Sequence, residues 1–289
     1  LFIDIIKYLN MKKILLSIVL LLACKDDNLD GFSFGDDLSD DLCPNCLWHD
    51  EFDGDALSLS NWNYELGYGN NGWGNDEWQE YTNQNTEMGD GDLIISAKKE
   101  SDNLGKRDGS ITSSRITTQG KFEFGPRTKI EARIKLPWGQ GIWPAFWSLG
   151  SNFSEVGWPA CGEFDIIEMV GANPLTHDNN KTVHSTNHWK HTDGNHAMYG
   201  NSKKMDNSLS SDYNIYELIW TEEFMETKIN GISFHKIDIN AGSVNEPFHK
   251  PFFFILNIAV GGNWPGSPNN ETQFPQKMYV DYIRVFQLK

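Results

Sequence analysis

The sequence has few basic residues, few cysteines and no apolar run long enough to cross a membrane. Its 289 residues include 24 Lys and Arg against 40 Asp and Glu, a formal charge of −16 at pH 7. A nucleic-acid partner is therefore excluded, because a phosphate backbone needs a basic surface. A neutral polymer is not repelled by such a chain. The four cysteines form no cluster with histidines at metal-ligand spacing, which argues against a catalytic metal site.

The start of the chain has the pattern of an export signal. Met11 is followed by two lysines, residues 14–23 are apolar or small, and Cys24 comes next. This segment is too short to span a membrane. Its Leu-Leu-Ala-Cys ending resembles a bacterial lipobox, in which the cysteine is lipidated. We expect residues 1–23 to be upstream residues and a lipoprotein-type signal peptide, and the protein to lie on the outer membrane or cell surface. If Cys24 is incidental, the protein is secreted.

Two further segments are expected behind the signal. Residues 24–46 are rich in Asp, Gly and Ser, which predicts a flexible tether. The Cys43 and Cys46 pair near its end is interpreted as a local disulfide or, alternatively, a redox-active pair. Cys161 is then expected to be a small buried hydrophobe. Residues 47–289 contain no linker-like break and no internal repeat, so we expect one catalytic domain that is a monomer.

The body of the chain reads as strands without a helical period. Charged and aliphatic residues alternate over residues 129–136, which predicts a half-buried antiparallel strand. Short strand signals separated by Gly, Asn, Asp and Pro predict an all-β fold of two stacked antiparallel sheets, a sandwich or jelly roll with one concave face. The other predicted strands are 92–97, 110–117, 121–124, 216–220, 252–258 and 278–286.

Three acidic residues lie within one apolar strand segment. Glu163, Asp165 and Glu168 are separated by Phe and Ile, where an ionised carboxylate has no ordinary reason to sit. Alternation places the first two on one face and Glu168 on the other. One extra residue, a β-bulge at Ile166 or Ile167, would bring all three to the same face.

Crowded carboxylates have a chemical consequence. They cannot all ionise easily, so at least one should keep a proton near neutral pH. An acid beside a base is the equipment of a glycosidase. The alternative is a row of solvated acids on a surface-facing strand. Eleven tryptophans are present, and although most are expected in the core, aromatic faces on a groove also grip sugar rings. Trp143 and Trp147 share a strand face, and Trp158 leads into the acids.

Four motifs, in this order, resemble glycoside hydrolase family 16, in particular its laminarinase-like branch. They are Trp-Pro-Ala-Phe-Trp at 143–147, Glu-x-Asp-x-x-Glu at 163–168, Thr-Val-His at 182–184 and Asn-Ile-Ala-Val-Gly-Gly-Asn-Trp-Pro-Gly at 257–266. The resemblance runs from about residue 50 to residue 286. It implies a β-jelly-roll with a substrate cleft across its concave sheet, and no organic cofactor. The implied activity is retaining endo-hydrolysis of β-1,3-glucan of the laminarin type, extending to mixed-linked β-1,3-1,4-glucan.

The same resemblance implies roles for individual residues. Glu163 is the expected nucleophile, Glu168 the acid/base, and Asp165 the residue that hydrogen-bonds and tunes the nucleophile. Retention requires the two catalytic carboxyl groups about 5 to 5.5 Å apart, which again demands the bulge. The cleft positions that the resemblance implies for substrate binding are Asn75, Arg115, Trp143, Trp147, Trp158 and His184.

Departures from the family pattern leave alternatives open. Asp76, Trp78 and Glu80 stand where Asn, Leu and Tyr are common, so the donor-side subsites are expected to differ. One alternative is the same fold acting on a marine galactan such as agar or carrageenan. A second alternative is a surface glycan-binding protein without catalytic activity.

A structural Ca²⁺ is a further implication of the resemblance. Many family members hold this ion on the convex side of the domain. Glu51, the carbonyl of Gly91 and Asp281 match the segments that supply it, in keeping with the preference of calcium for oxygen ligands. The alternative is that these are surface acids in turns.

Overall fold

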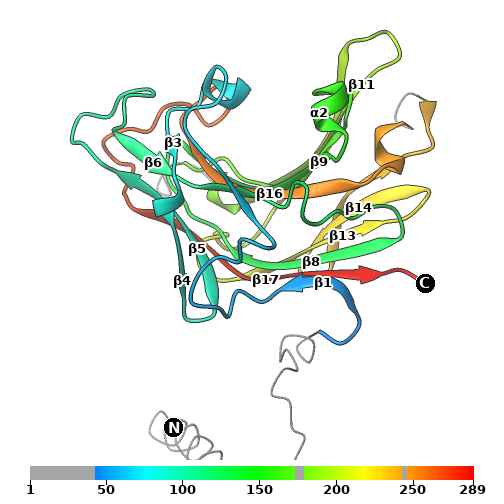
Figure 1. The fold of residues 1–289 in the computed structure, drawn as a ribbon. Coiled ribbons are helices and arrows are strands. Elements are labelled where there is room, and N and C mark those ends of the chain that lie inside the picture. Colours follow the sequence, from blue (N-terminus) through cyan, green and yellow to red (C-terminus); the bar gives the residue numbers. More distant parts are fainter. Residues whose placement is uncertain (1–42, 173–178, 243–245) are drawn as a thin grey trace, which may run out of the picture. The chain divides into compact units, whose positions relative to one another are not determined.

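The computed structural model describes residues 43–172, 179–242 and 246–289. The predicted signal peptide and most of the predicted tether, including Cys24, lie outside this part. Within the described ranges, none of the helices has the length and apolar character needed to cross a membrane. The strands form two sheets stacked face to face, which confirms the predicted all-β fold (Figure 1).

The larger sheet has ten strands. Its order is β15-β14-β13-β8-β17-β5-β6-β3, with β1 added beside β17 and β4 beside β5. The pairings described for it are antiparallel except that of β3 with β6. Its strands are β1 Cys46–Asp50, β3 Glu80–Tyr81, β4 Thr86–Gly89, β5 Asp92–Lys99, β6 Ile111–Ser113, β8 Thr128–Lys135, β13 Asn214–Trp220, β14 Phe224–Ile229, β15 Ile232–Asp238 and β17 Gln276–Gln287.

The smaller sheet has seven strands in the order β12-β11-β10-β9-β16-β7-β2. It curves, and loops rise at both of its sides (Figure 1). Its strands are β2 Asn63–Glu65, β7 Arg115–Thr117, β9 Ile142–Gly150, β10 Glu163–Glu168, β11 Thr182–Lys190, β12 His196–Lys204 and β16 Phe252–Val260. The short helical turns are η2 Gly72–Asp76, η3 Asn83–Asn85, α2 Phe153–Val156, η4 Asn179–Lys181 and η6 Pro247–His249.

The core lies between the sheets because alternating side chains of both point inward. In β8, Ile130, Ala132 and Ile134 are fully buried, as the alternation in the sequence predicts. Across the core, Trp220 of β13 stands edge-on to Phe252 of β16 with ring centroids 5.2 Å apart. Each large apolar side chain buried in this way contributes about 1.5–3 kcal/mol. This core provides the rigid support for the outer face of the seven-stranded sheet.

Two strand predictions are wrong in detail. The predicted strand 110–117 is interrupted at Ser114, because β6 pairs with β5 in one sheet and β7 pairs with β16 in the other. The chain changes sheets there. Residues 121–124 are not a strand: the backbone N–H groups of Lys121 and Phe122 donate to the carbonyl of Thr118 in a turn, leaving one bridge from Phe124 to β16.

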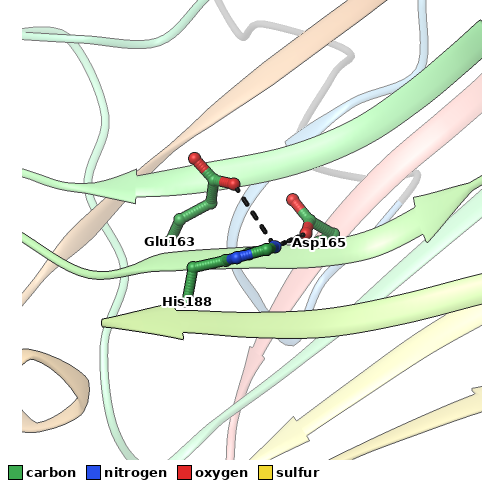
Figure 2. A group of neighbouring side chains, drawn as sticks. All are labelled: Glu163, Asp165 and His188. Atoms are coloured by element: carbon green, nitrogen blue, oxygen red, sulfur yellow. Dashed lines mark hydrogen bonds and ion pairs between the residues drawn. The ribbon is translucent and has the colours of Figure 1, made fainter. Parts of the chain in front are cut away.

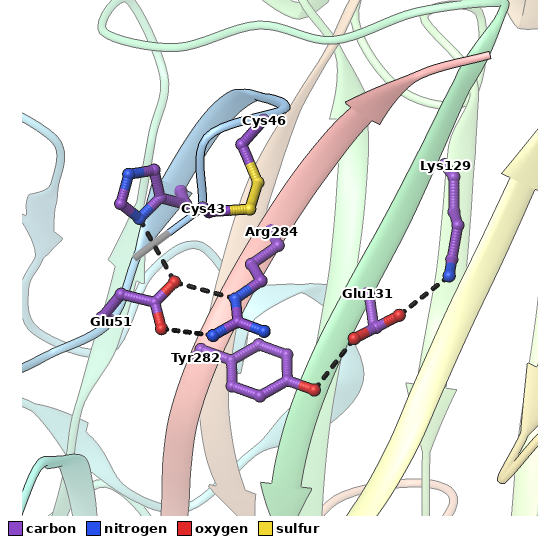
Figure 3. Close-up of a disulfide and its surroundings, with 8 residues drawn as sticks. Cys43, Cys46, Glu51, Lys129, Glu131, Tyr282 and Arg284 are labelled. Carbon is purple, nitrogen blue, oxygen red and sulfur yellow. Dashed lines mark hydrogen bonds and ion pairs between the residues drawn. A yellow bond between two sulfur atoms is a disulfide. The ribbon is translucent and has the colours of Figure 1, made fainter. Parts of the chain in front are cut away.

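The cysteines behave as two separate structural features. Cys43 and Cys46 form a disulfide, which confirms the local pairing (Figure 3). Cys161 is fully buried and packs with Leu149 and Phe253 in a small cluster on the outer face of the seven-stranded sheet, separate from the core between the sheets. Burial, and the nearby charge of Glu163, raise the pKa of its thiol to about 11, so it stays protonated and inert.

Candidate active site

A β-bulge in β10 places the three acids on one face. Asp165 pairs with Thr186 of β11 and Glu168 with His184, so three steps on β10 match two steps on β11. The pairing with β9 shifts between Asp165 and Ile167 in the same way. The bulge predicted at 166–167 is therefore present. The side chains of both isoleucines there enter the core, where neither is exposed.

All three acids line a cleft on the outer face of the seven-stranded sheet. The cleft has two adjoining parts of about 550 and 660 Å³, which share the three acids, Asn75, Trp143 and Trp158. Arg115 and Trp147 line the first part and His184 lines the second. The structure thus brings together all nine residues proposed from the sequence for catalysis and substrate binding.

Electrostatics distinguishes the acids from one another. Burial raises the pKa of Glu163 and of Asp165 to about 8, and raises that of Glu168 well above its ordinary value. The charge of Asp165 raises the pKa of both glutamates further, whereas His188 and Arg115 lower that of Glu163. A hydrogen bond from the Glu168 carboxyl to Asp165 also raises the pKa of Glu168 and lowers that of Asp165. Of the two glutamates, Glu168 therefore holds its proton more strongly and Glu163 ionises more readily.

A histidine of β11 contacts the acids directly, and it is not the one singled out from the sequence. His188 Nε2 lies 3.1 Å from Asp165 Oδ2 and 3.7 Å from Glu163 Oε1 (Figure 2). His184 instead packs edge-on against Trp264, with centroids 5.1 Å apart. Both histidines face the cleft because they are four residues apart on one strand. The register sets His188 opposite Glu163 and His184 opposite Glu168. The ring of His184 is packed against Trp264, whereas that of His188 reaches Asp165.

Tryptophans flank the acids and are themselves held by polar contacts. The indole N–H of Trp143 donates to Glu168 Oε1 over 3.0 Å, and that of Trp147 donates to Asn257 Oδ1 over 2.7 Å. Trp158 is 48% exposed at the rim. Fixed, partly exposed indoles offer flat apolar faces to a sugar ring.

Arg115 organises the first part of the cleft. Its guanidinium lies between two indoles, 4.5 Å from the centroid of Trp73 and 4.7 Å from that of Trp147, and it forms an ion pair with Glu65. Cation–π contacts on both faces fix this group where it lowers the pKa of Glu163. Trp73 and Glu65 are cleft residues that sequence reasoning missed.

A buried carboxylate holds Asn75 in place. Glu77 is 4% exposed and accepts hydrogen bonds from Asn75 Nδ2 at 3.3 Å and Gln79 Nε2 at 2.7 Å. Burial raises the pKa of Glu77. On the outer side of the same loop, Asp76 forms ion pairs with Lys106 and Arg107, the latter at 2.9 Å. Asp76, which replaces the Asn common in the family, thus attaches this loop to the segment that carries Lys106 and Arg107.

The Gly-Gly pair at 261–262 allows two cleft loops to meet. Gly262 has φ 117°, and a Cβ there would lie 2.8 Å from the carbonyl oxygen of Asn75. Gly261 has φ 70°, and a Cβ there would collide with the indole of Trp78. The N–H of Asn263 donates to the same Asn75 carbonyl over 2.9 Å. These glycines permit a close backbone approach that any other residue would block.

The second part of the cleft is formed by a strand that the sequence did not predict. β12 is largely exposed, and its polar sequence lacks the apolar alternation that identifies a strand. His196, Met198 and Gly200 of β12 line the cleft, as does Trp264. Trp264 stands edge-on to Trp143 with centroids 5.4 Å apart.

The residues predicted to hold calcium lie away from the cleft: Glu51 directly follows β1, Gly91 is in the β4–β5 turn and Asp281 is on β17. Both carboxylate oxygens of Glu51 accept from Arg284, at 2.8 and 2.7 Å (Figure 3). Asp281 pairs with Arg133. Two carboxylates already neutralised by arginines do not fit a cation in this arrangement. Among the described residues, the group of acids and histidine close enough to share a metal ion belongs to the cleft instead, and comprises Glu163, Asp165 and His188.

A curved β-sandwich with crowded carboxylates in a tryptophan-lined cleft defines the class of polysaccharide-cleaving jelly rolls. Comparison with known proteins agrees. The chain belongs to the family described as glycosyl hydrolases family 16, whose model matches residues 48–284. This confirms the family predicted from the sequence.

Individual relatives and structures support this assignment. The chain is 35% identical over 258 residues to the beta-glucanase of Rhodothermus marinus, covering 83% of this chain and 84% of that protein. It is 38% identical over 245 residues to the clotting factor G alpha subunit of Tachypleus tridentatus, covering 83% of this chain but only 34% of that subunit. The endo-beta-1,3-glucanase structure from Pyrococcus furiosus superimposes with a TM-score of 0.75 at 39% identity, covering 84% and 94% of the two chains.

Proposed function

We propose that this protein is a retaining endo-glycosidase that hydrolyses β-1,3-glucan of the laminarin type and also accepts mixed-linked β-1,3-1,4-glucan. The observation that carries the proposal is the bulge in β10, which turns Glu168 onto the cleft face beside Glu163 and Asp165. The similarity to the beta-glucanase of Rhodothermus marinus and to the endo-beta-1,3-glucanase of Pyrococcus furiosus supports the choice of glucan.

In the first step, the Glu163 carboxylate attacks the anomeric carbon while Glu168 donates its proton to the glycosidic oxygen. The bond to the leaving sugar breaks and an ester bond to Glu163 forms. The acid requires a raised pKa, which burial and the charge of Asp165 provide for Glu168. The nucleophile requires ionisation, which Arg115 and His188 favour at Glu163.

In the second step, Glu168, now ionised, takes a proton from water, which attacks the same carbon. The ester bond breaks and Glu163 is released as a carboxylate, so two inversions give net retention. Asp165 accepts hydrogen bonds from Glu168 and His188 and holds both in place. The tryptophans bind the sugar rings by their apolar faces.

A reducing-end assay on laminarin, mixed-linked glucan, agarose and κ-carrageenan tests this function. We expect release from laminarin by the wild-type protein and loss of turnover by about 10⁴-fold or more in Glu163→Ser. The variant should still bind a laminari-oligosaccharide by calorimetry. No release from laminarin would reject the proposal, and NMR showing the inverted anomer first would reject retention.

Two alternatives remain distinguishable by the same assay. Release from agarose or carrageenan alone would identify a galactanase on this fold. Binding without release from any polysaccharide would identify a surface glycan-binding protein. Three buried acids crowded in one cleft favour the catalytic interpretation, because a binding groove gains nothing from the cost of burying them.

The proposal includes export as a monomeric lipoprotein, with its lipid anchor the only contact with a membrane. Its support is the lipobox-like sequence ending at Cys24. Mass spectrometry of the mature protein should find a diacylglyceryl group on this cysteine, and Cys24→Ser should release the protein from membranes. Size-exclusion chromatography with light scattering tests the monomer.

A further inference from the structure

The cleft contains a histidine pair whose second member has no assigned role. His188 uses Nε2 to contact Asp165 at 3.1 Å, and its other nitrogen, Nδ1, lies 2.9 Å from His196 Nε2. Figure 2 shows the imidazole of His188 aimed at both acids. A continuous chain of contacts therefore runs from Asp165 through His188 to His196 at the edge of the sheet.

This chain has a preferred order of donors. A neutral imidazole carries one N–H, and the group that bonds one nitrogen decides which nitrogen holds the proton. If His196 donates from Nε2 to Nδ1 of His188, the proton of His188 must sit on Nε2. There it donates to Asp165. The opposite tautomer would direct a lone pair at the carboxylates, which is repulsive whenever Asp165 is ionised.

We propose that His196 is a positioning residue that fixes His188 in the Nε2–H tautomer, so that His188 presents a donor to Asp165 and toward Glu163. The inference rests on the proposed function for its catalytic consequence. It deepens that function by extending the machinery from β10 and β11 to the edge strand β12.

The surroundings of His196 suit this role. It opens β12 and pairs in register with Lys190, which brings its ring beside that of His188, with centroids 5.1 Å apart and planes inclined by 17°. Trp158 packs on it from the cleft rim with centroids 4.7 Å apart. Burial and the neighbouring His188 lower the pKa of His196, so it is neutral at pH 7 and carries a single N–H.

Loss of His196 should change the pKa of Glu163 through its effect on His188. The titratable groups that line the cleft with His188 are the acids of β10, His184 and His196, and Arg115 of β7 acts on Glu163 from the adjoining part. Of these contacts, removing His196 changes only the one at Nδ1. Glu163 would then lose part of the influence of His188 that lowers its pKa. The acidic limb of the activity profile should move to higher pH.

The tautomer can be measured without any substrate. Long-range ¹H–¹⁵N NMR of the full chain should show His188 protonated on Nε2 in the wild type at pH 7, and a mixture of tautomers in His196→Ala. A wild-type His188 protonated on Nδ1, or a ratio unchanged in the variant, would overturn the proposal. The NMR measurement does not depend on glucan cleavage. A failure of the tautomer proposal can therefore be told apart from a failure of the proposed function.

Kinetics provides the second readout. His196→Ala should lower kcat about 10-fold, as expected for a partner that acts through another group, with KM within about twofold. The acidic limb of the kcat/KM profile should move to higher pH. His196→Gln, whose amide can donate to Nδ1, should recover most of the rate.

A matched control is His191→Gln, in the hairpin between the same strands. His191 is exposed and pairs with Asp193, so its loss should leave rate and pH profile at wild-type values. Equal activity of His196→Ala and wild type, or no recovery by glutamine, would contradict the role. If His196→Ala has a much lower Tm than the wild type, the role of His196 is judged from the rate and pH profile of His196→Gln compared with those of the wild type.

Discussion

Trp143 donates its indole N–H to Oε1 of Glu168 over 3.0 Å, so a ring placed to bind sugar also tunes the proposed acid. The same indole stands edge-on to Trp264. We therefore expect this one side chain to couple substrate stacking to proton transfer.

Replacing Trp143 by Phe should separate these two effects. The indole bond lowers the pKa of Glu168, so its loss should raise that pKa and move the alkaline limb of kcat/KM to higher pH. We expect the rate to fall about 10-fold. Trp147→Phe, whose lost bond goes to Asn257, should weaken binding without moving this limb. An alkaline limb that stays in place in Trp143→Phe would contradict the coupling.

Replacing Asp165 by Asn should stabilise the fold at alkaline pH. The folded pKa of Asp165 is raised to about 8, above the ordinary value for aspartate. Its stabilising contribution is therefore present below that ordinary value and is lost as the pH rises through about 8. The gain in Tm of the variant should grow from pH 4 to pH 8, reaching about 3 °C or more.

Calorimetry at several pH values checks this, with Asp193→Asn as control. Asp193 is an exposed acid whose pKa is lowered by hydrogen bonds to Asn195, so its variant should show no such growth. A constant Tm difference for Asp165→Asn across the same pH range would contradict the prediction.

Adding a methyl group at Gly262 should disturb donor-side binding. The new Cβ would lie 2.8 Å from the Asn75 carbonyl at a φ of 117°, so the loop carrying Asn75 must move. We expect Gly262→Ala to raise KM about 10-fold with a smaller change in kcat. Gly231→Ala, at a positive φ but with open space around it, controls for backbone strain alone. Equal KM values in the two variants would exclude the loop contact as the cause.

Removing the outer attachment of the same loop should have a milder effect. Arg107 bonds both Asp76 and the carbonyl of Glu77. Arg107→Ala should raise KM about threefold at low salt. In 0.5 M NaCl the difference in KM between variant and wild type should be smaller, because salt screens the ion pair of the wild type. Lys99→Ala removes a surface ion pair with Asp102 elsewhere and should leave KM unchanged. A KM for Arg107→Ala equal to that of the Lys99 control would refute the attachment.

Chelation should leave the fold intact. Glu51 and Asp281 are neutralised by Arg284 and Arg133 in the structure, so EDTA should change Tm by less than about 1 °C. Thermal melts with and without added CaCl₂ check this. A large decrease of Tm in EDTA that calcium reverses would show that a calcium ion displaces the arginines from these carboxylates. The predicted calcium site would then be correct.

The chain by itself determined the fold class, the identity of the acids and the need for a bulge. These rest on local chemistry: alternation marks β8, and three carboxylates in an apolar strand have few explanations other than a reaction. The family motifs added the cleft tryptophans and the activity to be tested.

Only the tertiary structure decided which residues contact the acids of the cleft and the predicted calcium ligands. His184 and His188 both lie opposite an acid of β10, and the packing of His184 on Trp264 leaves His188 as the histidine that contacts Asp165. His196 enters because the polar edge strand β12 pairs beside β11. The arginines on Glu51 and Asp281 likewise come from distant strands. Such contacts join residues far apart in sequence, where no local periodicity records them. The spacing of Glu163 and Glu168 revealed that a reaction site was present, and the sheet supplied the groups that can tune it.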